Sequence, residues 1–314
     1  MKSEPCFTST GDNPPELLRA LQNLPLEAKI DYSKRLIWQF YHIADRKIYV
    51  SFSGGQDSTV LLHLARSVYA STPAVFFDTG LEFPEIRDFV KTRENVEIVR
   101  PTMSFRQVVG EYGYPIGGKN MAHWVDLAQR GQPSGIRQMS ADTKYGYKKY
   151  AWLVDAPFRI SEKCCDKLKK EPATRYHRDT GRCPLIGTRT EESKIRAQTW
   201  FNSGEINDSA VKSCTPLSIW RDSDIKEYIR RFNLEISPIY SKGYDRTGCA
   251  YCMFGIFSDP GRFIKLKHTH PQLWAYCMKD YDKGGIGLEK VLDFLSIDSG
   301  RSQSSLVDFS EAES

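Results

Sequence analysis

The chain has 314 residues, enough for one large or two modest domains and for a sizeable core. Hydrophobic residues make up 40% of it, and no apolar run approaches the roughly 18–20 residues of a membrane helix, which excludes an integral membrane protein. The start, MKSEPCFTSTGDNPPELL, lacks a basic segment followed by an apolar one, so we expect no secretory signal and a cytoplasmic location. The net charge of +5 is compatible with phosphate-bearing ligands, including nucleic acid, but is too small to demonstrate them.

Alternating periodicities in the first hundred residues predict an α/β fold. Apolar spacing predicts a helix over 32–45, and KIYVSF then predicts a strand over 47–52. Further on, helical periods and β-prone runs continue to alternate; they predict helices over 60–68 and 84–93 and strands over 74–78 and 96–100. Short strands separated by helices imply right-handed crossovers, so we expect a mainly parallel, twisted sheet with helices on both faces.

The rest of the chain is less regular. Residues 113–182 are rich in Lys, Tyr and Gly and predict helices with long connections; a strand over 183–189 and a helix to about 199 follow. Residues 238–261 predict a structured loop, and helices are expected over 261–281 and 288–297. We therefore expect a helical lead over 1–45, an α/β nucleotide-binding domain over 46–235, and a helical, cysteine-bearing part over 236–314 packed on that domain.

A glycine-rich turn lies between the first strand and its helix. Its sequence is SGGQDS, comprising Ser53, Gly54, Gly55, Gln56, Asp57 and Ser58. Glycines let the backbone curl so that several N–H groups face an anion, and the helix N-terminus adds partial positive charge. No lysine follows the glycines, which disfavours the nucleoside-triphosphatase loop that ends in Gly-Lys-Ser/Thr. The alternative is a turn in which Asp57 and Ser58 only cap the helix; these two residues are equally suited to approach a magnesium ion.

The second strand also ends in a polar turn, DTGLEFPE, from Asp78 to Glu85. Pro84 and Glu85 suit the first turn of a helix, so an ordinary strand-to-helix connection explains the shape. It does not explain acidic residues beside the expected nucleotide. In a parallel sheet ligands bind beyond the carboxyl ends of the strands, where this turn and SGGQDS both fall.

Four cysteines form two close pairs, Cys164 with Cys165 and Cys249 with Cys252. In a reducing compartment such pairs indicate metal ligands or reactive thiols rather than disulfides. Adjacent cysteines strain to reach a single tetrahedral zinc, whereas a 4Fe-4S cube offers a separate iron to each thiolate. An iron–sulfur cluster is therefore favoured over zinc, and redox-active or inert thiols remain as alternatives.

Six segments taken together resemble the phosphoadenylyl-sulfate reductase family of the PP-loop adenine-nucleotide α-hydrolase superfamily. They are SGGQDS, VFFDTGLEFPE, KCCDKLKKEP, IGTRTEESKIRA, CTPLSIWRDSDIKEYI and IYSKGYDRTGCAYC, in this order between about Ile48 and Cys252. The resemblance implies that Ser53, Gly54, Gly55, Asp57 and Ser58 hold phosphate. It further implies that Asp78, Thr79 and Gly80 line the nucleotide pocket, that Arg189 and Arg196 face the anionic substrate, and that Cys164, Cys165, Cys249 and Cys252 ligate a cluster.

Two departures from the reductases bear on the activity. The reductases end in a Glu-Cys-Gly motif whose cysteine attacks sulfur, but here no cysteine follows Cys277. They also tend to carry an eroded phosphate loop, whereas SGGQDS is complete, as expected if pyrophosphate is gripped while it leaves. The combination resembles the ATP pyrophosphatase component of bacterial DNA phosphorothioation systems.

That resemblance implies an ATP- and Mg²⁺-dependent enzyme that adenylates an acceptor, with Asp57, Ser58, Arg189 and Arg196 as catalytic residues. Nucleic acid would be the acceptor, DNA rather than tRNA, and a cysteine desulfurase would supply sulfur as a persulfide. Cys183, Cys214 and Cys277 are candidate relays or merely buried thiols. Self-association is compatible with the sequence.

Three rival functions are also compatible with the sequence. One is a thiol-dependent sulfonucleotide reductase in which Cys277 replaces the missing tail cysteine. Another is a tRNA thiolation enzyme that shares the adenylation step. The third is a catalytically idle subunit that binds a nucleotide or a cluster.

Overall fold

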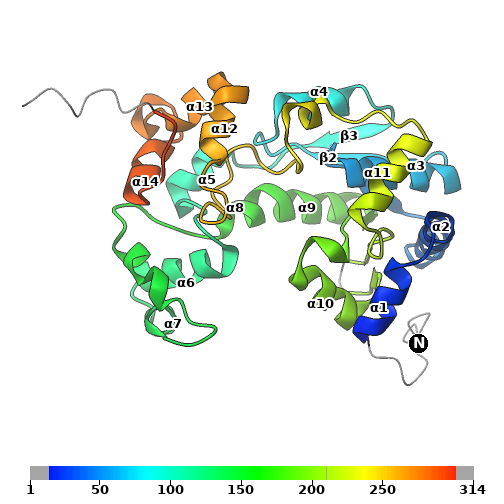
Figure 1. Ribbon diagram of the computed structural model, residues 1–314, viewed down its shortest axis with the longest axis horizontal. Coiled ribbons are helices and arrows are strands. Elements are labelled where there is room, and N and C mark those ends of the chain that lie inside the picture. Colours follow the sequence, from blue (N-terminus) through cyan, green and yellow to red (C-terminus); the bar gives the residue numbers. More distant parts are fainter. Residues whose placement is uncertain (1–13, 210, 302–314) are drawn as a thin grey trace, which may run out of the picture. The chain divides into compact units, whose positions relative to one another are not determined.

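The computed structural model describes residues 14–209 and 211–301 and divides into two compact units. Unit 1 consists of Met1–Thr102 and Lys169–Gly248, and unit 2 of Met103–Leu168 and Cys249–Ser314. Each unit is assembled from two separate stretches of chain, which Figure 1 shows in the colours of the sequence. The expected segments 1–45, 46–235 and 236–314 divide the chain differently, because residues 103–168 pack with the C-terminal stretch.

Unit 1 contains a six-stranded sheet in the order β3-β2-β1-β4-β6-β5. The strands are β1 (Ile48–Ser51), β2 (Ala74–Phe77), β3 (Val96–Val99), β4 (Cys183–Leu185), β5 (Ile206–Asn207) and β6 (Ser213–Cys214). All neighbouring pairs are parallel except β5 with β6. The expected mainly parallel α/β sheet is confirmed.

The helices of unit 1 lie before, between and after the strands in chain order. They are α1 (Pro14–Gln22), α2 (Leu26–Ile43), α3 (Gln56–Val68), α4 (Pro84–Lys91), α9 (Glu171–Thr180), α10 (Lys194–Ser203) and α11 (Asp222–Arg231), with short 3₁₀ turns η3 (Thr190–Glu192) and η4 (Pro238–Lys242). Val60, Leu61, Leu64 and Ala65 of α3 have no exposed surface. This apolar stripe explains why the residues after the glycine-rich turn form a helix against the sheet.

Unit 2 is helical. Its elements are α5 (Phe105–Tyr112), α6 (Lys119–Gln129), α7 (Pro133–Ser140), η1 (Lys148–Asp155), α8 (Lys163–Cys165), α12 (Arg262–Thr269), α13 (Pro271–Met278), η5 (Tyr281–Lys283) and α14 (Leu288–Phe294). Ser104 and Gln107 form a capping box at the start of α5. Between α8 and α9 the chain makes a π-helical turn, η2 (Asp166–Lys170). Pro172 lacks the N–H that would bond the carbonyl of Leu168, which accounts for a widened turn there.

Two predicted elements end earlier than expected. The helix expected over 261–281 is divided into α12 and α13, because Pro271 cannot continue the hydrogen bonding of α12 and instead begins α13. The strand expected over 183–189 ends at Leu185, where the chain turns toward the glycine-rich loop. No helix among the described residues is long and apolar enough to cross a membrane.

Candidate functional site

Two loops meet where the strand order of the sheet reverses direction. β1 and β4 are neighbouring parallel strands, and from them the chain proceeds outward in opposite directions. The glycine-rich loop follows β1, and Gly187 follows β4. A Cβ at Gly187 would lie 3.3 Å from the backbone of Asp57 and Ser58, so the two loops touch. Such a reversal point is the usual ligand-binding crevice of an open α/β sheet.

The two glycines of the loop have different structural roles. Gly54 has a φ of +73°, and a Cβ there would lie 3.0 Å from Ile86 of α4. It supplies a left-handed turn and a close approach to α4. Gly55 has an ordinary φ of −81° and immediately precedes α3. A Cβ on Gly55 would lie 2.6 Å from Oγ1 of Thr247, so the absence of a side chain at Gly55 leaves room for Thr247 beside the loop.

Three backbone N–H groups of the loop donate to hydroxyl oxygens. The amide of Ser53 donates to Oγ of Ser58 at 3.2 Å, and that of Gly55 donates to Oγ of Ser53 at 3.4 Å. The amide of Gln56, the first of α3, donates to the hydroxyl of Tyr240 at 2.8 Å. Each of these loop amides thus donates to a separate hydroxyl oxygen, the atom type that a phosphate would present.

Tyr240 and Thr247 belong to this site, although the motif analysis did not assign them a role. Tyr240 lies on η4, and its side chain is hydrogen bonded to Thr247. Burial raises the pKa of Tyr240, so its hydroxyl stays protonated at neutral pH. Both residues fall in the segment IYSKGYDRTGC, whose hydroxyl groups were the available signal.

Asp57 forms an ion pair with Arg189. Nε of Arg189 lies 2.7 Å from Oδ1 of Asp57, although the N–H is not aligned with the oxygen as a hydrogen bond requires. Burial raises the pKa of Asp57; Arg189 opposes that shift, and the carboxylates of Glu192 and Asp222 add to it. The surroundings of Asp57 therefore disfavour its ionised form, and Arg189 partly offsets that effect.

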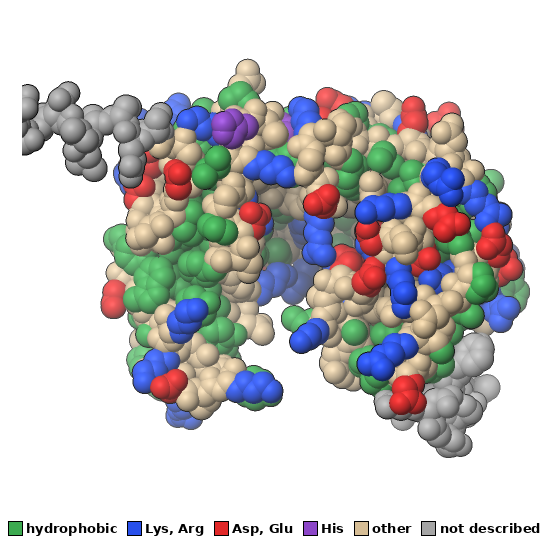
Figure 2. All heavy atoms as spheres, in the orientation of Figure 1, with side chains coloured by type: hydrophobic (Ala, Val, Ile, Leu, Met, Phe, Trp, Pro, Cys, Tyr) green, Lys and Arg blue, Asp and Glu red, His purple; other side chains and the backbone are tan. Residues whose placement is uncertain are grey.

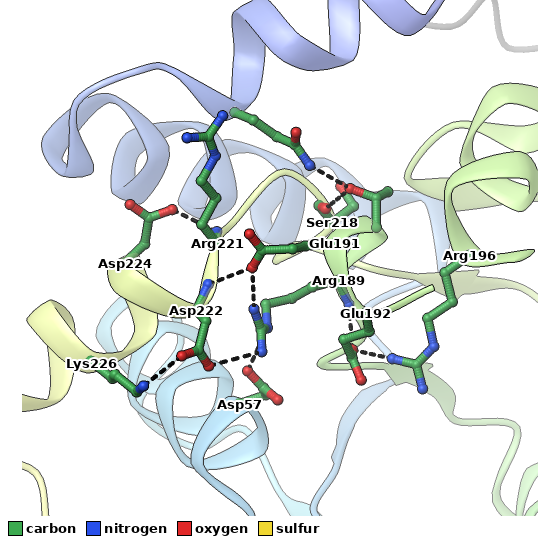
Figure 3. A network of polar contacts seen from close by, with 12 residues as sticks. Asp57, Arg189, Glu191, Glu192, Arg196, Ser218, Arg221, Asp222, Asp224 and Lys226 are labelled. Carbon is green, nitrogen blue, oxygen red and sulfur yellow. Dashed lines mark hydrogen bonds and ion pairs between the residues drawn. The ribbon is translucent and has the colours of Figure 1, made fainter. Parts of the chain in front are cut away.

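Arg189 is surrounded by carboxylates rather than open to solvent. Only 9% of its side chain is exposed, and besides Asp57 it pairs with Glu191 at 3.1 Å and Asp222 at 3.5 Å. Figure 3 shows the guanidinium between these three acids. Three acids therefore engage the guanidinium, and its contact with Asp57 helps to hold that carboxylate in place. That Arg189 faces an anionic substrate stays a prediction.

Arg196 is also engaged by an acid. Its Nη1 pairs with Oε1 of Glu192, and the same carboxylate oxygen accepts from the backbone N–H of Arg189 at 2.9 Å. Its side chain is 41% exposed, so unlike Arg189 it borders solvent. A substrate anion would have to compete with Glu192 for this guanidinium.

The second polar turn, after β2, forms an internally bonded structure. Asp78 is buried and accepts from the amide of Gly80 at 3.1 Å, and its other oxygen lies 3.3 Å from both Arg87 and Arg100. The hydroxyl of Thr79 donates to Glu82 at 2.7 Å. In this arrangement Asp78 and Thr79 shape the turn, and their contribution to a nucleotide pocket stays a prediction.

The four paired cysteines all belong to unit 2. Cys164 lies on α8, and the turn after η4 carries Cys249 and Cys252, whose amide donates to the Cys249 carbonyl at 3.2 Å. The pKa of the Cys164 thiol is raised, first by a hydrogen bond with Cys165, then by burial and by the thiols of Cys249 and Cys252. Two pairs that are far apart in sequence thus act on one thiol.

A short extended segment explains how these pairs come together. Tyr114 forms a bridge with Ile160, four residues before Cys164, and Gly117 forms one with Phe254, two residues after Cys252. Gly117 has a φ of +72°, and a Cβ there would overlap Met121. Residues 114–117 therefore hold both cysteine-bearing loops.

The donor chemistry at this point suits a cluster, since four thiols can provide one ligand for each iron of a cube. Within residues 14–209 and 211–301, no group of three or more His, Cys, Asp or Glu side chains has the arrangement of a completed metal site. Ligation by these four thiols consequently remains a proposal.

The other described cysteines are poor candidates for sulfur relays. Cys183, Cys214 and Cys277 are buried, and burial raises the pKa of each thiol. A buried neutral thiol is a weak nucleophile. In this structure the three behave as core residues, which favours the alternative that they are merely buried.

Fold and site together define a nucleotide-binding α/β protein with a phosphate-binding type of loop at the reversal point of its sheet. The sequence profile of the phosphoadenosine phosphosulfate reductase domain matches residues 47–116 and 119–254. The chain belongs to this family, and the resemblance seen in its motifs is confirmed.

Individual relatives are distant. The chain is 28% identical over 258 residues to an uncharacterized protein of Methanocaldococcus jannaschii, a match that covers 79% of this chain and 52% of the relative. It therefore spans about half the length of that protein. It is 27% identical to adenosine 5'-phosphosulfate reductase of Anoxybacillus flavithermus, covering 74% of this chain and 86% of the relative. Phosphoadenylyl-sulfate reductase from Candida auris, a solved structure, aligns with a TM-score of 0.43 at 16% identity, covering 77% and 97% of the two chains.

Proposed function

We propose that the protein is an ATP pyrophosphatase that adenylates an acceptor and prepares it for sulfur transfer, with a DNA phosphate as the acceptor. The observation that supports this most directly is the set of loop amides on Ser53, Gly55 and Gln56, which all donate to oxygen atoms. A complete loop of this kind suits the β- and γ-phosphates, which a sulfated nucleotide lacks.

In the first step, a non-bridging oxygen of the acceptor phosphate attacks the α-phosphorus of ATP. The bond from that phosphorus to the bridging oxygen breaks, and pyrophosphate leaves with the electron pair. Loop amides and Mg²⁺ stabilise the charge that develops on pyrophosphate. We assign Mg²⁺ to Asp57, whose carboxylate lies 2.7 Å from Arg189.

In the second step, AMP is the leaving group. The terminal sulfur of a cysteine persulfide attacks the acceptor phosphorus, and the bond between phosphorus and the adenylated oxygen breaks. A second thiol then cleaves the sulfur–sulfur bond, which leaves sulfur on phosphorus and oxidises the two thiols to a disulfide. A cysteine desulfurase is the proposed source of the persulfide. A 4Fe-4S cluster on Cys164, Cys165, Cys249 and Cys252 would contribute iron–sulfur chemistry.

The test is to incubate the anaerobically purified chain with acceptor DNA and with ATP labelled in either the α- or the γ-phosphate. AMP and pyrophosphate in equal amounts are expected. Release of ADP and orthophosphate would reject the proposal, and so would nucleotide binding without turnover. Mass spectrometry of DNA and RNA from cells with and without the gene identifies the acceptor, because the added sulfur changes the mass of the modified nucleotide.

A sulfonucleotide reductase is the second candidate, because the match to the Anoxybacillus flavithermus reductase covers most of that protein. Cys277 was its expected nucleophile, but that residue has no exposed surface and its raised pKa keeps the thiol neutral. Thioredoxin-dependent release of sulfite from a sulfated adenine nucleotide would establish this activity.

A further inference from the structure

Residues 136–152 of unit 2 expose aromatic and basic side chains together. Tyr145 is 76% exposed, Trp152 41% and Ile136 49%, although large apolar side chains are usually buried. Between and beside them are Arg137, Lys144, Lys148 and Lys149, all exposed. Figure 2 shows Lys and Arg side chains gathered around the end of unit 2 that carries α7. We call the set Arg137, Lys144, Tyr145, Lys148, Lys149 and Trp152 the basic aromatic surface.

An ordered turn presents two members of this surface. The amide of Gly146 donates to the carbonyl of Thr143 at 3.0 Å, which makes Lys144 and Tyr145 the central residues of a β-turn. The amide of Tyr147 donates to the carbonyl of Gln138 at 3.1 Å and ties the turn back to α7. Tyr145 therefore projects into solvent from a defined backbone.

The 3₁₀ helix η1 presents two more members of the basic aromatic surface, Lys149 and Trp152. In a 3₁₀ helix, residues three apart lie on the same side, so Lys149 and Trp152 share one face while Leu153 is buried. The Trp152 ring packs against Phe294 with centroids 5.5 Å apart, and the remaining part of the ring is exposed. Trp152 is thus held on one part of its ring by packing, and the cation of Lys149 lies on the same face of η1.

The charge of the stretch identifies the kind of partner. Residues 136–152 contain four cations and one acid, Asp142, which pairs with Lys148 at 2.9 Å. Lysines are depleted in the cores of protein–protein interfaces, which argues against a protein partner. Cations that meet phosphates, interleaved with rings on which unstacked bases stack, are typical of surfaces that bind single-stranded nucleic acid.

We propose that the basic aromatic surface binds a single-stranded stretch of the DNA acceptor. The lysines contact phosphates, and Tyr145 and Trp152 stack on bases. The choice of DNA rests on the proposed function, whereas the site itself rests on the charge and exposure of these residues.

The experiment measures binding of the full chain to a labelled single-stranded oligodeoxynucleotide of about 16 nucleotides by fluorescence anisotropy at several salt concentrations. Replacing Lys144, Lys148 and Lys149 together by Ala should weaken binding at least tenfold and reduce the salt slope by about 2. Tyr145→Ala should weaken binding roughly 5- to 150-fold at any salt. The matched control is Lys283→Ala with Lys290→Ala, two exposed lysines of unit 2 that pair with Asp280; it should bind like the unaltered chain.

The proposal would be overturned if the triple-lysine variant and Tyr145→Ala both fold, as circular dichroism shows, and both bind the oligodeoxynucleotide with unchanged affinity. Tighter binding of the matching oligoribonucleotide with the same lysine dependence would overturn the choice of DNA. Cleavage of ATP is measured in parallel. If DNA binding depends on the surface while ATP is never cleaved, the proposed function fails and the surface stands; if ATP is cleaved and DNA binding ignores the surface, only this inference fails.

Discussion

The hydroxyl of Tyr240 accepts a 2.8 Å hydrogen bond from the backbone N–H of Gln56, the first amide of α3. A phosphate oxygen bound at the N-terminus of α3 would use the same amide. Under the proposed function, the ring hydroxyl therefore occupies the place of a ligand oxygen, and we expect phosphate binding to displace it.

Tyr240→Phe should tighten pyrophosphate binding. The variant leaves the Gln56 amide without its acceptor, which costs about 1–3 kcal/mol in the ligand-free protein and is recovered when phosphate binds. We expect the dissociation constant of pyrophosphate to fall at least about fivefold, and the free energy of unfolding without ligand to fall by a similar energy. Calorimetric titration and thermal unfolding measure the two effects.

Tyr244→Phe serves as the control, because Tyr244 lies in the same segment and its ring packs against Phe83, 4.6 Å away between centroids. It should leave pyrophosphate binding unchanged. AMP, which lacks the β- and γ-phosphates, should bind both variants like the unaltered chain. Weaker pyrophosphate binding by Tyr240→Phe would show that the hydroxyl contacts the ligand instead of yielding to it.

Arg189→Gln should move the acidic limb of the pH–activity profile to higher pH. Burial already raises the pKa of Asp57 and Arg189 opposes that rise, so removing the guanidinium raises the pKa further. If the ionised carboxylate is the active form, activity is lost at a higher pH than in the unaltered chain. Arg189→Lys keeps the charge and should keep the limb close to its original position.

Arg189→Gln should also lower the free energy of unfolding. At neutral pH we expect the free energy of unfolding to fall by about 2 kcal/mol. The loss is smaller than for a fully buried ion pair, because 31% of the Asp57 side chain is exposed. The folded pKa of Asp57 is raised in the variant, so the deficit is present above that pKa and shrinks as pH falls through it. Denaturant unfolding at several pH values measures it; a deficit that grows toward acid would contradict this account.

Local pattern predicted the fold better than the site. The strand, the Gly-Gly turn and α3 are adjacent in sequence, and their periodicities and turn residues act within a few positions. Tyr240 is 184 residues from Gln56, so only the folded topology brings them together. Sequence spacing could not predict the burial of Arg189 among three acids. Two of those acids lie on α3 and α11, and only the tertiary fold brings these helices close to Arg189.

The cysteine pairs illustrate the same limit. Their spacing indicated four ligands, and the mutual effect of their thiols on Cys164 agrees with their proximity. Residues 114–117, which hold the two loops, carry no pattern that would mark a strand-like bridge. Such a segment is specified by its neighbours rather than by its own sequence.

Cys164→Ser and Cys252→Ser should each lower the iron and acid-labile sulfide content of anaerobically purified protein by more than half. A cluster that loses one of its thiolate ligands is held by fewer bonds and is more easily lost. Cys183→Ala is the control, because Cys183 lies in β4 of unit 1 and should leave the iron content unchanged. Full retention of iron in Cys252→Ser, or zinc in place of iron in the unaltered chain, would rule out the proposed cluster.

Gly55→Ala should abolish most ATP cleavage while the chain still folds. The added methyl would lie 2.6 Å from Oγ1 of Thr247 and 3.4 Å from the Tyr240 hydroxyl, so Thr247 must move and the space above the loop amides shrinks. A displacement on this scale at a phosphate-positioning loop costs about a hundredfold in rate. Gly248→Ala is the matched control, since its methyl would meet nothing within 4 Å. Rates of pyrophosphate release and thermal unfolding of both variants test the prediction, and near-normal turnover by Gly55→Ala would show that nucleotide phosphates bind elsewhere.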